Sequence, residues 1–173
     1  MMRLRFAVIA FLGAACCAAS LAPSASSVTP TARPVVPCDD IILDTKFPYR
    51  TDGYRLVLGA VAVPPLYLRQ VVPTQSKPWA YWRKAGLVVR AGSPQITVTV
   101  PRGWRSRAAI TWGNGSAGHD SVSLAIASCD GPASVGHAYA GGFYLRSASA
   151  CVPIVFQVGR RTATVRFGIG RRC

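Results

Sequence analysis

Residues 95–100 read QITVTV and residues 162–169 read TATVRFGI, and in both stretches apolar and polar side chains alternate along the chain. Successive side chains of a β-strand point to opposite faces, so a period of two predicts strands with one buried face. The apolar positions that share a face are Ile96, Val98 and Val100 in the first stretch and Ala163, Val165, Phe167 and Ile169 in the second.

Other short apolar stretches, separated by Gly, Pro and Ser, predict further strands. Residues 79–85 fit either a single helical turn or a strand, and Gly159, Arg160 and Arg161 form a tight turn at a hairpin tip. The further strands are expected at residues 55–63, 87–90, 108–112, 121–128 and 152–158, with 55–63 and 152–158 in central positions because both of their faces are apolar.

The spacing of these strands decides the fold class that we expect. No window of the sequence shows a helical period over a useful length. About eight or nine strands with regularly spaced turns are typical of a β-sandwich. The sequence therefore predicts an all-β chain, with a single antiparallel β-sandwich over residues 38–173 and a β-barrel as the alternative.

The N-terminal residues predict export. Arg3 and Arg5 precede an uncharged apolar run over residues 6–19, which is shorter than the roughly 20 residues that a membrane-spanning helix needs. This pattern is typical of a signal peptide, which we place at residues 1–19, so we expect a secreted protein with no transmembrane helix in the mature chain. The alternative is a lipoprotein anchored through Cys16 or Cys17. Residues 20–37 are rich in Pro, Ser and Thr and are expected to form a flexible linker.

Four cysteines follow the predicted signal peptide: Cys38, Cys129, Cys151 and Cys173. An even number of cysteines in an exported chain predicts two disulfides, and the absence of a closely spaced pair argues against a metal site. Four cysteines allow three pairings. We favour Cys38–Cys173 as a staple that brackets the domain and Cys129–Cys151 as a loop clamp, because cross-linking a long loop restricts the unfolded chain most.

The charge balance is strongly basic, with 20 Lys and Arg against 6 acidic residues and a formal net charge of +14. A basic surface attracts polyanions, and for an exported chain we expect an anionic cell-wall polymer or a glycan rather than nucleic acid. The aspartates near the start of the domain are expected to form ion pairs with Arg50 and Arg55. The candidate ligand contacts are Arg102, Trp104, Arg105, Arg107, Trp79 and Trp82.

The aromatic residues of this region are expected to differ in burial. Trp104 and Trp112 are expected to be inside or half inside, whereas one residue among Trp79, Tyr81 and Trp82 is expected to be exposed. If the segment around Trp104 is a strand, Arg105 and Arg107 share a face.

Catalysis is the second interpretation of the sequence. His119 and Asp120 lie in a Gly-rich loop with Ser116, which suggests a hydrolase, but adjacent loop residues usually point apart and the G-x-S-x-G pattern is missing. We therefore expect no catalytic residues, no metal and no cofactor.

Several segments carry a family resemblance: KAGLVVRAG from Lys84, VTVPRGWRSRAAITWGN from Val98, AYAGGFYLRSASACVP from Ala138, and the ending VRFGIGRRC. The chain after residue 80 resembles a family of uncharacterised secreted proteins of high-GC Gram-positive bacteria. The resemblance implies export and a single domain, and it implies no activity.

These observations lead to one preferred function and two alternatives. The preferred function is a non-enzymatic, exported binding or structural module at the cell envelope. The alternatives are a small secreted hydrolase that uses His119 and Asp120, and a secreted inhibitor or protein-interaction module.

Overall fold

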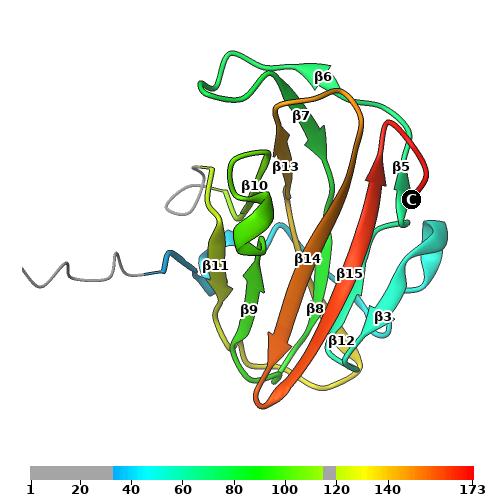
Figure 1. Cartoon of the computed structure of the whole chain (residues 1–173). Coiled ribbons are helices and arrows are strands. Elements are labelled where there is room, and N and C mark those ends of the chain that lie inside the picture. Colours follow the sequence, from blue (N-terminus) through cyan, green and yellow to red (C-terminus); the bar gives the residue numbers. More distant parts are fainter. Residues whose placement is uncertain (1–32, 115–119) are drawn as a thin grey trace, which may run out of the picture. The chain divides into compact units, whose positions relative to one another are not determined.

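The computed structural model describes residues 33–114 and 120–173, which lie within one compact unit. The described part contains fifteen strands in three sheets and three short 3-10 helices (Figure 1). The predicted signal peptide, Cys16 and Cys17, and the predicted linker up to residue 32 lie outside the described residues.

The six-stranded sheet is built around a long hairpin. β14 and β15 pair antiparallel over nine residue pairs, and the turn at Gly159 and Arg160 joins them at the predicted hairpin tip. β14 also pairs with β9, whereas β5 pairs with β15 only at Gly168 and Ile169. The strand order is β1 (Val35–Val36), β11 (Ser123–Ile126), β9 (Ile96–Thr99), β14 (Ala150–Val158), β15 (Arg161–Ile169) and β5 (Tyr67–Leu68).

The five-stranded sheet corrects one sequence prediction. Residues 55–63 are not a single central strand but a hairpin, because Leu58 and Gly59 have φ values of 53° and 71° and reverse the chain. Its first strand, β3, lies at the edge of the sheet. The strand order is β2 (Leu43–Lys46), β12 (Val135–Tyr139), β8 (Leu87–Arg90), β4 (Val61–Val63) and β3 (Arg55–Val57).

The four-stranded sheet settles the ambiguous segment at residues 79–85. That segment contains the strand β7 and not a helical turn. The strand order is β10 (Ala108–Trp112), β13 (Gly141–Leu145), β7 (Tyr81–Lys84) and β6 (Val72–Pro73), and the three 3-10 helices of the described chain are η1 (Cys38–Asp40), η2 (Thr51–Gly53) and η3 (Arg102–Trp104).

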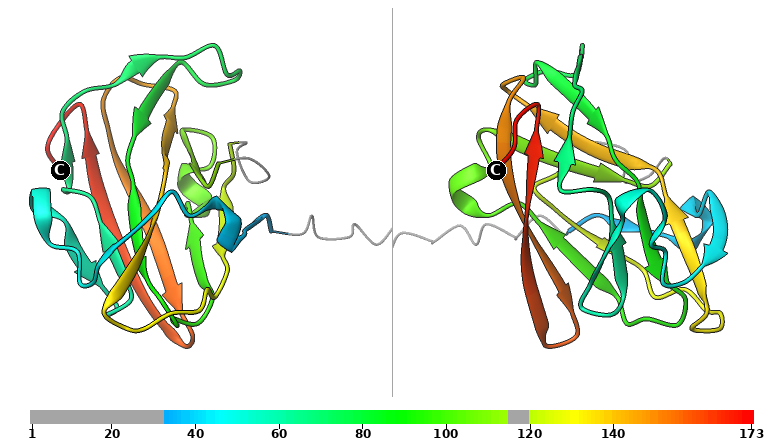
Figure 2. Two further views of the ribbon diagram at one scale, coloured as in Figure 1. Left: turned by 180° about the vertical axis from the view of Figure 1, so that it is seen from behind. Right: turned by 90° about the vertical axis from the view of Figure 1, so that its right-hand side faces the viewer.

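All three sheets contribute to one large hydrophobic core. Its aromatic centre is Phe143, whose ring centroid lies 5.8 Å from that of Trp112 and 5.2 Å from that of Phe167. The indole N–H of Trp112 donates to the carbonyl oxygen of Ala85 at 2.8 Å, so the buried polar atom of this large side chain is satisfied. In the side view of Figure 2, the β14–β15 hairpin (orange to red) forms one side of the molecule.

The all-β prediction is confirmed, and both sequence stretches that led to it have the predicted buried face. No sheet in the described chain closes into a barrel. The expected strand number was too low, because several strands have only two residues and carry no periodic signal. The pairing is not purely antiparallel either, since β1 pairs parallel with β11 and β5 pairs parallel with β15.

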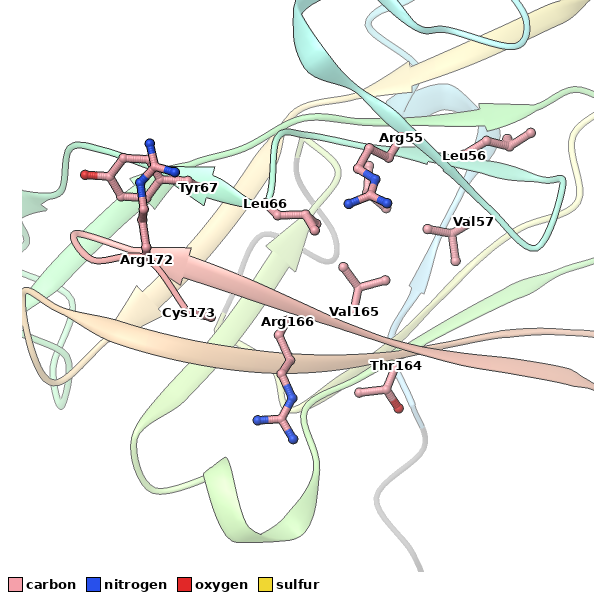
Figure 3. Close-up of a pocket in the computed structure, with 11 residues that line it drawn as sticks. Arg55, Leu56, Val57, Leu66, Tyr67, Thr164, Val165, Arg166, Arg172 and Cys173 are labelled. Atoms are coloured by element: carbon pink, nitrogen blue, oxygen red, sulfur yellow. The ribbon is translucent and has the colours of Figure 1, made fainter.

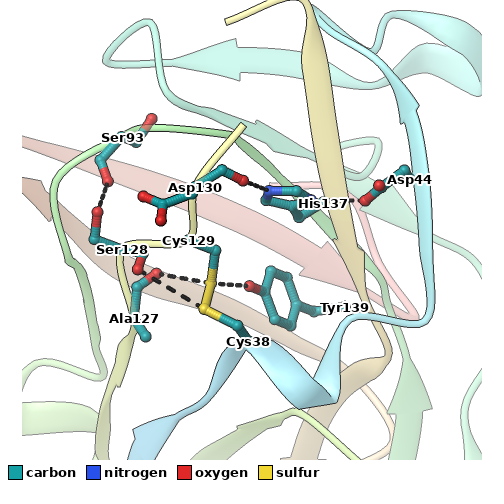
Figure 4. Close-up of a disulfide and its surroundings, with 9 residues drawn as sticks. All are labelled: Cys38, Asp44, Ser93, Ala127, Ser128, Cys129, Asp130, His137 and Tyr139. Atoms are coloured by element: carbon teal, nitrogen blue, oxygen red, sulfur yellow. Dashed lines mark hydrogen bonds and ion pairs between the residues drawn. A yellow bond between two sulfur atoms is a disulfide. The ribbon is translucent and has the colours of Figure 1, made fainter. Parts of the chain in front are cut away.

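The predicted disulfide pairing is wrong. Cys38 is bonded to Cys129, with 5.7 Å between the Cα atoms, and Cys151 and Cys173 are free thiols (Figure 4). The parallel register of β1 and β11 places Val36 opposite Ile126, so the chain segments that follow both strands meet at the two cysteines. A two-residue edge strand decides this pairing, and the cysteine spacing gives no indication of it.

The disulfide lies against a buried polar cluster (Figure 4). The hydroxyl of Tyr139 donates to the sulfur of Cys129 at 3.4 Å, and burial, followed by the charges of Asp40 and Asp44, raises the pKa of Tyr139 to about 12. Tyr139 therefore stays neutral beside the disulfide at physiological pH.

The close approach of β10 and β13 at Gly141 generates a stability prediction. A Cβ atom on Gly141 would overlap the carbonyl oxygen of Thr111 and the Trp112 side chain, and the backbone cannot move aside cheaply. Gly141→Ala should therefore lower the free energy of unfolding by roughly 1–3 kcal/mol or more, as overpacked sites do. Gly103→Ala is the control, because open space surrounds Gly103, and its effect should stay within about 0.5 kcal/mol. Urea unfolding followed by tryptophan fluorescence measures both, and equal stabilities of the two variants would contradict the packing of β10 on β13.

The disulfide generates a second prediction. Replacing Cys38 and Cys129 together by Ala should lower the free energy of unfolding by roughly 2–5 kcal/mol, because the bond closes a loop with a sequence separation of 91 residues. Denaturant unfolding of the unreduced protein measures this loss. Peptide mapping without reductant should recover Cys38 joined to Cys129, and recovery of Cys38 joined to Cys151 or Cys173 would show that the β1–β11 register is not the one described.

Candidate functional site

The segment around Trp104 forms η3 followed by a turn, so the condition under which Arg105 and Arg107 would share a strand face is not met. The ring of Trp104 is half-buried, and the guanidinium carbon of Arg107 lies 3.9 Å from the ring centroid. Nη2 of Arg107 also donates to the carbonyl oxygen of Gly103 at 2.8 Å. The two contacts hold the guanidinium over the indole ring, where cation–π attraction adds to the hydrogen bond.

Arg102 and Arg105 are exposed and do not join Trp104 and Arg107 in a common hollow. Nε of Arg105 donates to the carbonyl oxygen of Val100 at 3.3 Å. Because the chain is helical here and not extended, Arg105 and Arg107 do not follow the alternation expected of a strand.

Trp104 and Arg107 line a hollow of about 410 Å³, which we call the Trp104 hollow. Arg146 and Arg171 line the same hollow from the loop after β13 and from the C-terminal tail. The backbone N–H of Arg146 donates to the carbonyl oxygen of Arg107 at 3.1 Å, so the edge of the four-stranded sheet sets the spacing of these two arginines. The hollow thus gathers three guanidinium groups around one aromatic ring.

A larger hollow of about 620 Å³, the Tyr67 hollow, lies between β3 and β15 (Figure 3). Arg172 lies over the ring of Tyr67, with 5.3 Å between the guanidinium carbon and the ring centroid. Arg55 and Arg166 are the other arginines of this hollow. Its remaining lining is largely apolar and comes from Leu56, Val57, Val63, Leu66 and Val165.

The two hollows share a wall, the C-terminal tail after β15. Arg171 lines the Trp104 hollow, and the next residue, Arg172, lines the Tyr67 hollow. Neither arginine was among the candidate ligand contacts that the sequence predicts, and the same is true of Arg55, Arg146 and Arg166. Each side of the tail therefore has one hollow, which contains three arginines and one aromatic ring.

The arginines of both hollows have no acidic partner among residues 33–114 and 120–173. The one ion pair in the described part of the chain joins Nδ1 of His137 to Asp44 at 2.7 Å. The expected ion pairs between the N-terminal aspartates and Arg50 or Arg55 do not form. Within the described residues, no carboxylate neutralises the positive charge in the two hollows, and this charge attracts anions.

The remaining aromatic candidates do not line the hollows, although the guanidinium carbon of Arg146 lies 5.7 Å from the ring centroid of Trp79. Trp79 is only 5% exposed, and its indole N–H donates to Asp120 at 2.7 Å, so its ring offers no free face. Trp112 is fully buried, as predicted. Trp82 is half-buried on the opposite face of β7 from Tyr81, and its ring centroid lies 4.6 Å from that of Tyr144 on β13.

Trp82 belongs to a row of side chains that crosses the four-stranded sheet. Val72, Trp82, Tyr144 and Ala109 are successive partners in register on β6, β7, β13 and β10. Val72 is 53% exposed and Trp82 and Tyr144 are half-buried, so the row presents an apolar, partly aromatic strip to solvent. Flat aromatic surfaces of this kind suit stacking against the apolar face of a ring.

The described structure does not test the arrangement of the residues proposed for hydrolysis. Ser116 and His119 lie outside the described residues, and the Asp120 carboxylate accepts from Trp79. In His137, Nδ1 contacts Asp44 and Nε2 contacts the carbonyl oxygen of Asp130 at 3.1 Å (Figure 4), so both ring nitrogens are occupied.

Two further features are absent from residues 33–114 and 120–173. This part of the chain holds no cluster of three or more residues able to ligate a metal ion. It also contains no helix that is long and apolar enough to span a membrane.

Comparison with known proteins adds no family: no protein-family model matches the chain, and no curated protein matches it.

Proposed function

We propose that this chain is a non-enzymatic, exported module of the cell envelope, with the broad form of a disulfide-stapled β-sandwich, and that it binds an anionic polymer through the Trp104 and Tyr67 hollows. The observation that carries the proposal is the placement of three arginines in each hollow, on either side of one tail, with no carboxylate partner in the described chain.

The geometry of the arginines suits phosphate or carboxylate groups. A guanidinium that lies on an aromatic ring is held in place, while N–H groups at its edge stay available to an anion. Arg107 on Trp104 and Arg172 on Tyr67 have this arrangement. Arg146 is also fixed, because its Nε donates to the carbonyl oxygen of Ser106 at 3.0 Å. Pre-positioned donors lose less side-chain freedom when an anion binds.

The presence of two hollows favours a polymer over a small anion. Each hollow offers its own set of donors, and binding at one raises the effective concentration of linked anionic groups at the other. A polymer with repeated phosphates or carboxylates, such as a wall polymer, has the charge pattern that these two sites match. Location in the envelope rests on the N-terminal signal pattern of residues 1–19 and is part of the proposal.

Glycan binding is the second candidate, and the row of Val72, Trp82 and Tyr144 favours it. The residues of this row line neither hollow, and stacking on them needs no charge on the ligand. Trp82→Ala should weaken binding of an uncharged N-acetylglucosamine oligomer if this row is the site, and should leave anion binding unchanged. Titration calorimetry with that oligomer tests the candidate, and equal affinities of the variant and the wild type would exclude it.

The anion-binding proposal predicts a specific response to arginine removal. Replacing Arg107, Arg146 and Arg171 together by Ala should weaken binding of inorganic polyphosphate by about tenfold or more at low salt, which corresponds to about 1.4 kcal/mol. The triple Lys variant keeps the charge but loses the planar two-donor fork, and it should retain only part of the affinity. The matched control replaces Arg160 and Arg161 at the hairpin tip, where neither hollow lies.

Salt separates a shaped site from diffuse attraction. Surface charges are screened over about 8 Å at physiological ionic strength, so diffuse attraction should vanish there while a fork-bound anion keeps some affinity. Fluorescence titration of wild type, triple variants and control at two salt concentrations measures this. If the wild type does not bind polyphosphate, or if the hairpin-tip control weakens binding as much as the triple Ala variant, the proposed function fails.

A further inference from the structure

The two free thiols of the described chain lie at the shared wall of the hollows. Cys151 is on β14 and lines the Trp104 hollow, and Cys173 is in the tail and lines the Tyr67 hollow. They are 22 residues apart in sequence (173 − 151), yet the β14–β15 hairpin returns the chain to the same place.

The register of the hairpin brings the tail onto Cys151. Cys151 is directly opposite Gly168 on β15. The chain folds back after Gly170, which has a φ of 65°. As a result, the backbone nitrogen of Cys173 lies 3.0 Å from the position that a Cβ atom at residue 168 would occupy. Cross-strand partners have Cβ positions about 4.5–5.5 Å apart, so Cys173 occupies the space next to the Cys151 side chain. Glycine at position 168 is what leaves room for this return.

The sulfur of Cys151 already faces the end of the tail. Its thiol donates to the carbonyl oxygen of Arg172, with 3.7 Å between sulfur and oxygen, one residue before Cys173. Disulfides form between cysteines whose Cβ atoms lie about 3.5–4.5 Å apart. Rotation of the Cys151 side chain from this carbonyl toward the adjacent Cys173 thiol would direct its sulfur at the second sulfur.

We propose that Cys151 and Cys173 form a second disulfide, which pins the C-terminal tail across the end of the β14–β15 hairpin. In this step each thiol loses a proton and the pair loses two electrons as one S–S bond forms. The electrons pass to an exchangeable disulfide, carried by an oxidoreductase or a small molecule, which becomes two thiols.

The environment of the reduced pair fits a structural role. Partial burial, followed by a hydrogen bond to Cys151, raises the pKa of Cys173 to about 11. At neutral pH the Cys173 thiol is therefore protonated and a poor nucleophile, unlike the thiolate of a catalytic cysteine. The oxidised pair would add a covalent tie to a segment now held by the backbone bond from Gly170 to Leu68 at 2.9 Å.

The direct test is peptide mapping of the full protein after equilibration with oxidised glutathione. Chymotrypsin cleavage after Leu145, Phe156 and Phe167 releases residues 146–156 and 168–173, which carry Cys151 and Cys173 apart from the other cysteines. Without reductant, the two peptides should be recovered joined, and together about 2 Da lighter than the sum of their masses, through loss of two hydrogens. Recovery of either peptide free, carrying glutathione, or joined to Cys38 or Cys129 would overturn the proposal.

Hydrogen exchange provides a second readout that does not depend on ligand binding. Amide exchange across residues 168–173 should be slower in the oxidised wild type than in Cys173→Ser, because the disulfide opposes fraying of the tail. Exchange in β2, at the edge of the five-stranded sheet and outside the sheet that holds β14 and β15, should be equal in both proteins and serves as the internal control. Equal exchange of the tail itself would show that no bond pins it.

The effect of this disulfide on anion binding in the two hollows rests on the proposed function and is measured separately. Cys151→Ser and Cys173→Ser should each weaken polyphosphate binding severalfold, because Arg171 and Arg172 lose their fixed positions. If the two peptides are recovered joined but both Ser variants keep the wild-type affinity for polyphosphate, the disulfide exists. The disulfide then does not fix the positions of Arg171 and Arg172 for binding. A wild type that binds no polyphosphate would refute the proposed function alone, because the peptide map decides the disulfide independently.

Discussion

The pairing of β14 with β15 is the constraint on which the rest of this structure depends. Nine consecutive residue pairs fix the two strands, and the other edge of β14 holds β9 in register. The same pairing carries Phe167 and Ile154 into the shared core, where Phe143 of the four-stranded sheet contacts Phe167. Beyond the C-terminal end of β15, the tail lies between the two hollows. Core, sheet order and candidate site therefore all take their positions from one hairpin.

This hairpin was predictable because its information is local. A period of two in residues 162–169, an apolar run before it and a Gly–Arg turn between them are enough to define it. The hairpin at Leu58 and Gly59 was missed because a leucine in a left-handed conformation has no sequence signature. Two-residue strands such as β1 and β5 are too short to show any period, and they are held by contacts that are distant in the sequence.

The candidate site also combines residues that the sequence predicts with residues that only the fold brings together. Trp104 and Arg107 were found because they are close in sequence and chemically distinctive. Arg55, Arg146 and Arg166 come from three different strands or strand ends, and only the folded chain gathers them beside the tail. The disulfide error has the same origin, since β1 approaches β11 through a parallel contact that no spacing rule describes. Sequence patterns identify neighbours along a strand, whereas a binding surface is assembled across strands.

The limited reach of β5 along β15 has a consequence for how copies of this protein meet. β5 covers only Gly168 and Ile169, so in the described chain the backbone groups from Arg161 to Phe167 have no strand on that side. An open strand edge is a template on which a second chain can add and start an aggregate. Arg161 and Arg166 are exposed on this strand, and two copies approaching edge to edge bring these like charges together. Repulsion between these arginines therefore opposes edge-to-edge pairing at the part of β15 that β5 leaves uncovered.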